Sequence, residues 1–317
     1  MDPFDLLDPD AAAAMRQAMY STFTGDVAAY LAEVRGRLDE APYPDDLPEL
    51  ASVTDEVADG PTGPIPVRLH RPTTETGGPV IVYFHGGGMV MGSVRAYHPV
   101  ATQLAAASGA TVVNVDYRLA PEHPVPAQAD DAYAAMCWVA ENAERLGVDP
   151  DRLAVCGDSA GGTLAASVAL RARDLGGPPI LCQVMLYAGV DYDLAAASMR
   201  EFAEGPGLTR ASVKFLKRLA GTVEAHDSPY AVPAMADDLT GLPQAIVATA
   251  EVDPIRDWSE RYAERLRDAR VQVTTVRYPG LQHGFISRAA ELQRARLAMA
   301  ELGGLLQAKF AHPLPRG

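Results

Sequence analysis

The residues from Leu153 to Thr163, LAVCGDSAGGT, have the types and spacing of a site for nucleophilic chemistry. The apolar residues predict a strand and the small residues after the serine predict a helix, so Ser159 would lie at the turn between them. Gly157 and Gly161 flank this serine in the G-x-S-x-G spacing of a turn that is too tight for side chains at those positions. Such a turn exposes the serine hydroxyl at the positive end of a helix, which favours a nucleophile.

A glycine-rich turn before a helix can instead bind a phosphate group. The chain contains neither the G-x-G-x-x-G nor the G-x-x-x-x-G-K-[ST] pattern of nucleotide-binding proteins, so that interpretation has no further support. A serine hydroxyl becomes a good nucleophile only when a base removes its proton and an acid orients that base. The nucleophile interpretation therefore depends on whether the chain supplies both groups.

Three histidines that follow Ser159 are candidates for the base: His226, His283 and His312. His312 lies in the C-terminal tail, and His226 lies beside a segment that we predict to be an insertion. His283 lies in a glycine-flanked loop directly after the last predicted strand, where its ring could turn toward the serine. We predict His283 as the base; its alternative role is that of a solvated loop histidine.

The acid is expected among the carboxylates after the strand that ends at Ala250. Asp253 precedes Pro254, which holds it in an extended conformation before the next helix begins. Asp257 falls in the first turn of that helix, where a carboxylate commonly does no more than stabilise the helix dipole. We predict Asp253 as the acid, with Glu251 as the second candidate.

A second unusual loop, His85-Gly86-Gly87-Gly88, directly follows the apolar strand predicted over residues 79–84. Three consecutive glycines are costly for folding, because glycine loses the most backbone entropy. We therefore predict that this loop presents backbone amides to a bound group that side chains would keep away. Main-chain N–H groups aimed at a developing alkoxide form an oxyanion hole. The predicted donors are Gly86, Gly87 and Ala160, the residue after the serine. Three further residues are expected to support the site: His85 and Gly88 in the glycine loop, and Asp158 as a loop anchor.

Composition narrows the possible functions. The chain has 317 residues, a mass of 33.6 kDa and a formal net charge of −14 at pH 7. This length allows one large α/β domain with an insertion, and the negative charge argues against nucleic-acid or anionic-membrane partners. Because no apolar run is long enough for a transmembrane helix and the acidic first residues do not resemble a signal peptide, we predict a cytoplasmic protein without stable membrane association. Cys137, Cys156 and Cys182 lack metal-like spacing and are expected to be reduced thiols, so no metal and no cofactor are predicted.

Alternation of strands and helices predicts the α/β class, with a mainly parallel sheet and helices on both faces. Each unusual loop follows a strand, as expected for a site at the carboxyl ends of the strands. Strands are predicted at 65–71, 79–84, 110–116, 153–156, 178–187, 244–250 and 271–277. Helices are predicted at 11–20, 27–38, 99–108, 127–146, 257–269 and 289–309, and a loop at 278–285.

Two segments depart from this alternation. Residues 1–47 are predicted to be mostly helical, and residues 191–224 contain two helical pieces in place of the next strand. We predict that both segments form a helical cap on a catalytic domain made of residues 48–190 and 225–317. For residues 1–47 the alternative is a simple surface extension.

Taken together, the motifs resemble those of the bacterial hormone-sensitive-lipase-like esterases, which have the α/β-hydrolase fold. The resemblance rests on YFHGGGMVMGS (83–93), DYRLAPEHPVPA (116–127), GDSAGG (157–162), AEVDPIRD (250–257) and HGF (283–285), which follow the family's order. It implies a triad of Ser159, Asp253 and His283, an oxyanion loop at 85–88 and a helical cap. Met89 departs from the family pattern, which has a bulky aromatic residue there.

The residues and the resemblance together predict a serine carboxylesterase. Its substrates would be small apolar esters with short to medium acyl chains, hydrolysed through an acyl-enzyme. One alternative is an amidase, deacetylase or lyase that uses the same residues. Another is a small-molecule binding module, although such relatives of the fold have lost the histidine that is present here as His283. A homodimer through the strand at 271–277 is implied by the family alone.

Overall fold

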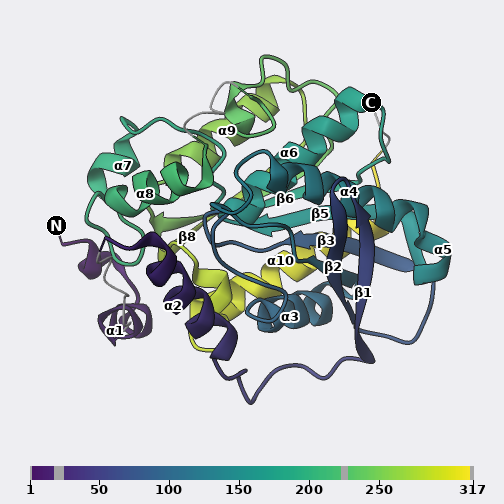
Figure 1. The fold of residues 1–317 in the computed structure, drawn as a ribbon, viewed down its shortest axis with the longest axis horizontal. Helices are drawn as coiled ribbons and strands as arrows, with labels where there is room; N and C mark the ends of the chain where they lie inside the picture. Colours follow the sequence, from purple (N-terminus) through teal and green to yellow (C-terminus); the bar gives the residue numbers. More distant parts are fainter. Residues whose placement is uncertain (1, 18–24, 223–227, 315–317) are drawn as a thin grey trace.

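A computed structural model describes residues 2–17, 25–222 and 228–314 and shows one central eight-stranded sheet (Figure 1). The strands lie in the order β1-β2-β4-β3-β5-β6-β7-β8. Pairings β1–β2 and β2–β4 are antiparallel and all the others are parallel, so the mainly parallel sheet predicted from the sequence is confirmed. The strands are β1 (Ser52–Gly60), β2 (Gly63–Arg71), β3 (Gly78–Phe84), β4 (Thr111–Val115), β5 (Val148–Asp158), β6 (Cys182–Leu186), β7 (Gln244–Val252) and β8 (Val273–Gln282).

Both faces of the sheet are covered by helices. Successive residues of β3 point alternately into two separate cores, with Val80 and Val82 in one and Ile81 and Tyr83 in the other. This double burial explains why the strand is a continuous apolar run. Helices α4 (Ala127–Glu141), α6 (Ala160–Leu175) and α9 (Arg256–Asp268) cover one face, and α3 (His98–Ser108) and α10 (Gln293–Ala311) cover the other (Figure 1).

Several predicted boundaries are wrong, each for a local reason. The helix predicted at 127–146 is interrupted at Asn142, whose side-chain Nδ2 donates to the Trp138 carbonyl at 2.9 Å, and a short helix α5 (Ala143–Leu146) follows. Strand β6 begins at Cys182 and not at Pro178, since the two prolines at 178–179 lack the N–H groups that a strand needs. The predicted loop at 278–285 is shorter, because β8 continues to Gln282.

The last helix likewise begins later than predicted, after a short 3₁₀ helix η3 (Phe285–Arg288). Two other 3₁₀ helices are η1 (Pro3–Leu6) and η2 (Pro233–Met235). Within the described ranges, no helix is both long and apolar enough to cross a membrane.

The N-terminal helices are α1 (Pro9–Gln17) and α2 (Val27–Glu40); residues 18–20 of the predicted first helix lie outside the described residues. The Asp26 side chain caps α2 by accepting from the Ala29 amide at 3.0 Å. Further along α2, the Arg35 guanidinium donates to the Val90 carbonyl at 2.8 Å and to both carboxylate oxygens of Glu122 at 2.8 and 2.9 Å. Arg35 thereby fixes α2 to the end of the glycine loop.

Between β6 and β7 lie the two helices α7 (Ala197–Glu201) and α8 (Arg210–Ala220), where the sequence predicts two helical pieces. Thr209 caps α8 by accepting from the Ser212 amide at 3.0 Å. The rings of Tyr30 in α2 and Phe215 in α8 meet edge-on at 5.8 Å. Figure 1 shows the purple α2 and the green α7 and α8 on the same side of the molecule.

Candidate active site

Ser159 stands alone between β5 and α6, at the sharp turn that the sequence predicts. Its backbone has φ +53°, a conformation that side-chain-bearing residues rarely adopt. A Cβ at Gly157 would collide with the Gly161 carbonyl, and a Cβ at Gly161 would collide with the Phe84 carbonyl. The two glycines are therefore required because backbone atoms fill the space where their side chains would be.

The side chains of Ser159, His283 and Asp253 form a continuous hydrogen-bonded line. His283 Nε2 lies 2.8 Å from Ser159 Oγ, and His283 Nδ1 lies 2.8 Å from Asp253 Oδ2. Asp253 is fully buried, and its second oxygen accepts from the Ile255 amide at 2.9 Å. The Tyr187 ring stands edge-on against the His283 ring at 4.9 Å. The arrangement has the order of nucleophile, base and orienting acid that acyl transfer needs.

The other candidates have different contacts. Glu251 Oε2 accepts from the Gly280 amide at 2.8 Å and so ties β7 to β8. Asp257 accepts from the Ser198 amide at 2.8 Å and joins α9 to α7. His312 ends α10 on the surface, and His226 lies outside the described residues.

The Gly86 amide does not fit its predicted place in the oxyanion hole. Its N–H donates to Asp158 Oδ1 at 2.8 Å, so it holds the glycine loop and is not free to bind an oxyanion. Among the residues that the structure describes, the amides of Gly87, Gly88 and Ala160 have no hydrogen-bond acceptor. Ala160 is free because it is the first residue of α6, where helix amides have no partner within the helix.

Asp158 and His85 brace the glycine loop from beneath. Asp158 Oδ1 also accepts from the Tyr83 hydroxyl at 2.7 Å, and burial raises the pKa of Asp158 to about 6. His85 Nδ1 donates to the Gly86 carbonyl at 2.8 Å, while its ring stacks on Tyr117 at 4.3 Å. Burial lowers the pKa of His85 to about 4, so the ring is neutral at pH 7. Both contacts fit the supporting roles expected from the sequence.

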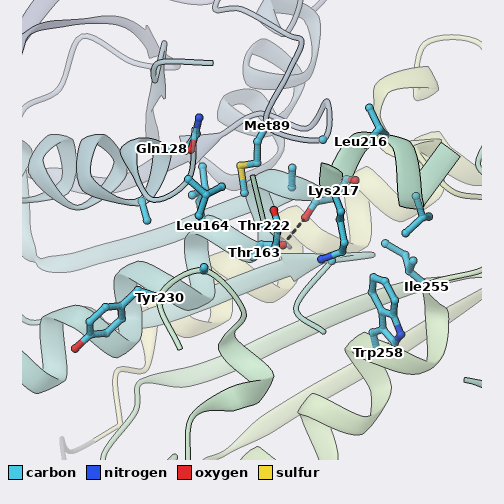
Figure 2. Close-up of a pocket in the computed structure, with 18 of the residues that line it drawn as sticks. Met89, Gln128, Thr163, Leu164, Leu216, Lys217, Thr222, Tyr230, Ile255 and Trp258 are labelled. Carbon is cyan, nitrogen blue, oxygen red and sulfur yellow. Dashed lines mark hydrogen bonds between the residues drawn. The ribbon is translucent and has the colours of Figure 1, made fainter. Parts of the chain in front are cut away.

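A cavity of about 80 Å³ opens beside Ser159 (Figure 2). Its lining is mainly apolar and comes from the glycine loop, α4, α6, α8 and α9. Met89, the residue that departs from the family pattern, is part of this lining and has a left-handed backbone with φ +66°. A Cβ at Gly88 would lie 3.0 Å from a methyl group of Leu216, which shows how closely α8 approaches the loop.

Sequence reasoning missed two positions at the site, Arg35 on α2, which contacts the end of the glycine loop, and Lys217 on α8, which lines the cavity. The Arg35 contacts join residues that lie 55 and 87 positions apart in the sequence, so no local pattern indicates these contacts. Lys217 does leave a signal, because it follows Val213 by four residues and precedes Ala220 by three, and both of those residues are buried. A lysine on the apolar face of a helix is a candidate for a pocket residue. Across residues 2–17, 25–222 and 228–314, no group of three His, Cys, Asp or Glu side chains is placed to hold a metal ion.

Known proteins resemble the chain over most of its length. A family model described as alpha/beta hydrolase fold matches residues 81–287, which include Ser159, Asp253 and His283. Esterase LipI of Mycobacterium tuberculosis is 44% identical over 267 residues, covering 83% of each chain. Carboxylesterase NlhH of the same organism is 43% identical over 274 residues, covering 84% of this chain and 85% of the relative. The solved structure of an esterase from Pyrobaculum calidifontis superposes with a TM-score of 0.86 at 38% identity, covering 95% of this chain and 98% of that one.

Proposed function

The chain belongs to the α/β-hydrolase family, in its hormone-sensitive-lipase-like branch, and we propose that it hydrolyses small apolar carboxylic esters through an acyl-enzyme. The observation that carries this proposal is the line of two 2.8 Å hydrogen bonds from Asp253 through His283 to Ser159. This line ends at an apolar cavity beside free main-chain amides.

In the first half of the reaction Ser159 Oγ attacks the ester carbonyl carbon. Its proton moves to His283 Nε2, while Nδ1–H donates to Asp253 and keeps the imidazole in the tautomer that can accept. The C–O bond to the alcohol then breaks, and the imidazolium returns its proton to the leaving alkoxide. The products of this step are a free alcohol and an ester of Ser159.

Water completes the cycle. His283 Nε2 takes a proton from a water molecule, whose oxygen attacks the acyl carbon of the Ser159 ester. Collapse of the second tetrahedral intermediate releases the carboxylic acid and returns the proton to Ser159 Oγ. The same base therefore serves both halves, as one histidine within 2.8 Å of the serine allows.

For the oxyanion hole we propose the amides of Gly87, Gly88 and Ala160, with Gly86 assigned to the anchor on Asp158. Each donor aimed at the alkoxide is worth about 3–4 kcal/mol in enzymes of this type. The preference for short to medium chains is supported by the cavity of about 80 Å³ beside Ser159, which is too small for a long acyl chain.

We also propose that α1 and α2 together with residues 191–224 form a cap on the catalytic domain. The Arg35 anchor and the contact between Tyr30 and Phe215 support this, because they join both segments over the glycine loop. A cytoplasmic location is supported by the free state of all three cysteines. A homodimer through β8, which lies at one edge of the sheet, is proposed on the family resemblance, and light scattering tests it.

The test of the proposed function combines turnover with labelling. We expect p-nitrophenyl esters of short acyl chains to be hydrolysed, and a serine-directed phosphonate to abolish turnover by adding one label, on Ser159. Ser159→Ala should lower kcat by at least about 10⁴-fold, whereas Ser167→Ala, two turns further along α6, serves as a control that should keep its activity.

Other outcomes identify the alternatives. Faster cleavage of matched amides, or labelling of Ser159 without ester turnover, would indicate an amidase or a lyase. Neither labelling nor turnover would indicate a binding module and contradict the proposal.

A further inference from the structure

Lys217 brings a cation into the cavity that contains Ser159. It lies on α8 and lines the cavity together with Val213 and Leu216 of the same helix. Figure 2 shows its side chain reaching from the helix into this space, on the side of Trp258. Most of the other large side chains that line the cavity are apolar, among them Met89, Leu164, Ile255 and Trp258, and its larger polar ones are Gln128 and Tyr230.

The Lys217 amine has three donors and no acceptor. Within the part of the chain that the structure describes, no hydrogen bond or ion pair to Nζ is formed. The carboxylate that influences it most is Asp191, which already pairs with Arg261 at 2.9 Å. What holds the amine in place are two aromatic rings, those of Tyr192 at 5.3 Å and Trp258 at 5.1 Å from Nζ to the ring centroid.

Holding the Lys217 ammonium in this cavity costs free energy unless an anion pairs with it. Placing an ammonium in apolar surroundings is unfavourable without a partner, and here burial lowers the pKa of Lys217 to about 8. The amine nevertheless carries its charge at pH 7. An apolar side chain of the same length would fill the cavity without this cost, so stability alone does not account for the lysine.

On the basis of the esterase function proposed above, we propose that Lys217 is a specificity residue that binds a carboxylate at the far end of the substrate. The preferred substrates are then esters with an apolar spacer between the reacting carbonyl and a terminal carboxylate. They include monoesters of dicarboxylic acids, with the charge on the acyl side, and esters of hydroxy acids, with the charge on the alcohol side. The apolar lining contacts the spacer, and the Lys217 amine donates to the carboxylate.

The experiment compares charged and neutral esters of equal length. Monoethyl glutarate and ethyl pentanoate form the acyl-side pair; 4-butanoyloxybutanoate and butyl butanoate form the alcohol-side pair. Release of the acid or alcohol is followed by chromatography. For the pair whose charge enters the cavity, we expect kcat/KM to favour the charged ester by about tenfold to a hundredfold, the value of one charged hydrogen bond. The effect should lie mainly in KM.

Three variants separate this role from a structural one. Lys217→Met should lower the charged-to-neutral ratio of kcat/KM to about one, and Lys217→Arg should restore part of the preference. Lys214→Met, which removes an exposed lysine from the same helix, should change neither. Circular dichroism checks that each variant is folded, and phosphonate labelling of Ser159 counts the active sites.

The two proposals fail in different ways. If ethyl pentanoate is hydrolysed but neither charged ester is preferred, or if Lys217→Met lowers kcat equally for both members of a pair, the inference about Lys217 is wrong and the esterase function stands. If no ester is hydrolysed and Ser159 is not labelled, the esterase function itself is wrong and this inference is wrong with it.

Discussion

Two walls of the same cavity are built in different ways. The wall at the ends of β3 and β5 carries Ser159 and the end of the glycine loop. Behind it, the polar groups that hold the serine and the loop, His283 and Asp158 among them, form hydrogen bonds of 2.7–2.8 Å. The wall formed by α8 is apolar except for Lys217, whose amine no described residue accepts from.

This difference separates chemistry from selection. Bond making requires donors and acceptors held in place before the substrate arrives, and the buried and partly buried side chains at the strand ends supply that rigidity. Substrate selection requires only protein groups, such as the Lys217 amine, that form their hydrogen bonds with the substrate. Changes in the first wall should therefore lower kcat for all esters, and changes in the second should alter which ester is preferred.

The largest effect is expected from Asp253→Asn. The amide would keep the size of the side chain but could stabilise the wrong tautomer of His283, and we expect kcat to fall by about 10⁴-fold with little change in KM. Steady-state kinetics on a short-chain p-nitrophenyl ester measures this. Glu251→Gln is the matched control, since Glu251 lies at the end of the same strand but bonds to Gly280. Equal losses in both variants would argue against Asp253 as the orienting acid.

The next effect is expected from Asp158→Ala. It leaves the Gly86 amide and the Tyr83 hydroxyl without their acceptor, so the glycine loop should shift and kcat should fall by roughly 10²-fold. Asp158→Asn keeps an oxygen that can accept from Gly86 and should lose much less. Kinetics normalised to the phosphonate-labelled fraction separates lost activity from lost folding. Full activity of the alanine variant would mean that Asp158 does not anchor the loop.

The same contrast explains how far the sequence predicted the molecule. Most strands and the positions of Ser159, Asp253 and His283 follow from local patterns, because each of these residues lies at a strand end within two positions of a glycine or proline. The bond from Gly86 to Asp158 joins residues 72 positions apart. No periodicity or spacing indicates such a bond, and it changes which amides are free.

The second wall was less predictable for a related reason. The sequence places two helical pieces at 191–224, but the side of α8 that faces the cavity depends on how that helix packs against α2 and the glycine loop. These contacts form between segments whose own patterns specify only that they are amphipathic. The cavity that includes Lys217 follows from the packing and not from any single motif.

Val213→Phe should alter the second wall without affecting the first. Val213 is buried, lines the cavity and lies outside the line from Asp253 to Ser159. The larger ring would take up part of the roughly 80 Å³ available, so kcat/KM for a hexanoate ester should fall by about tenfold relative to an acetate ester. Acetate hydrolysis should remain close to that of the unchanged protein. A similar loss for both esters would show that α8 also positions the catalytic residues.

The smallest effect concerns the charge on Lys217, and it depends on the groups that face the amine. These are the Asp191 carboxylate in the segment before α7, which Arg261 neutralises, and the uncharged rings of Tyr192 and Trp258. The titration of Lys217 can therefore be followed through substrate preference.

Since the pKa of Lys217 is about 8, its amine is charged at pH 7 and mostly neutral at pH 9. The kcat/KM preference for the charged ester over its neutral partner reports the free protein, and we expect it to fall several-fold as the pH rises between these values. Taking the ratio removes the pH dependence of the catalytic steps that both esters share. Lys217→Arg retains its charge throughout this range, so its smaller preference should stay constant. A ratio that falls equally in the arginine variant would assign the titration to another group and leave the amine of Lys217 without a part in selection.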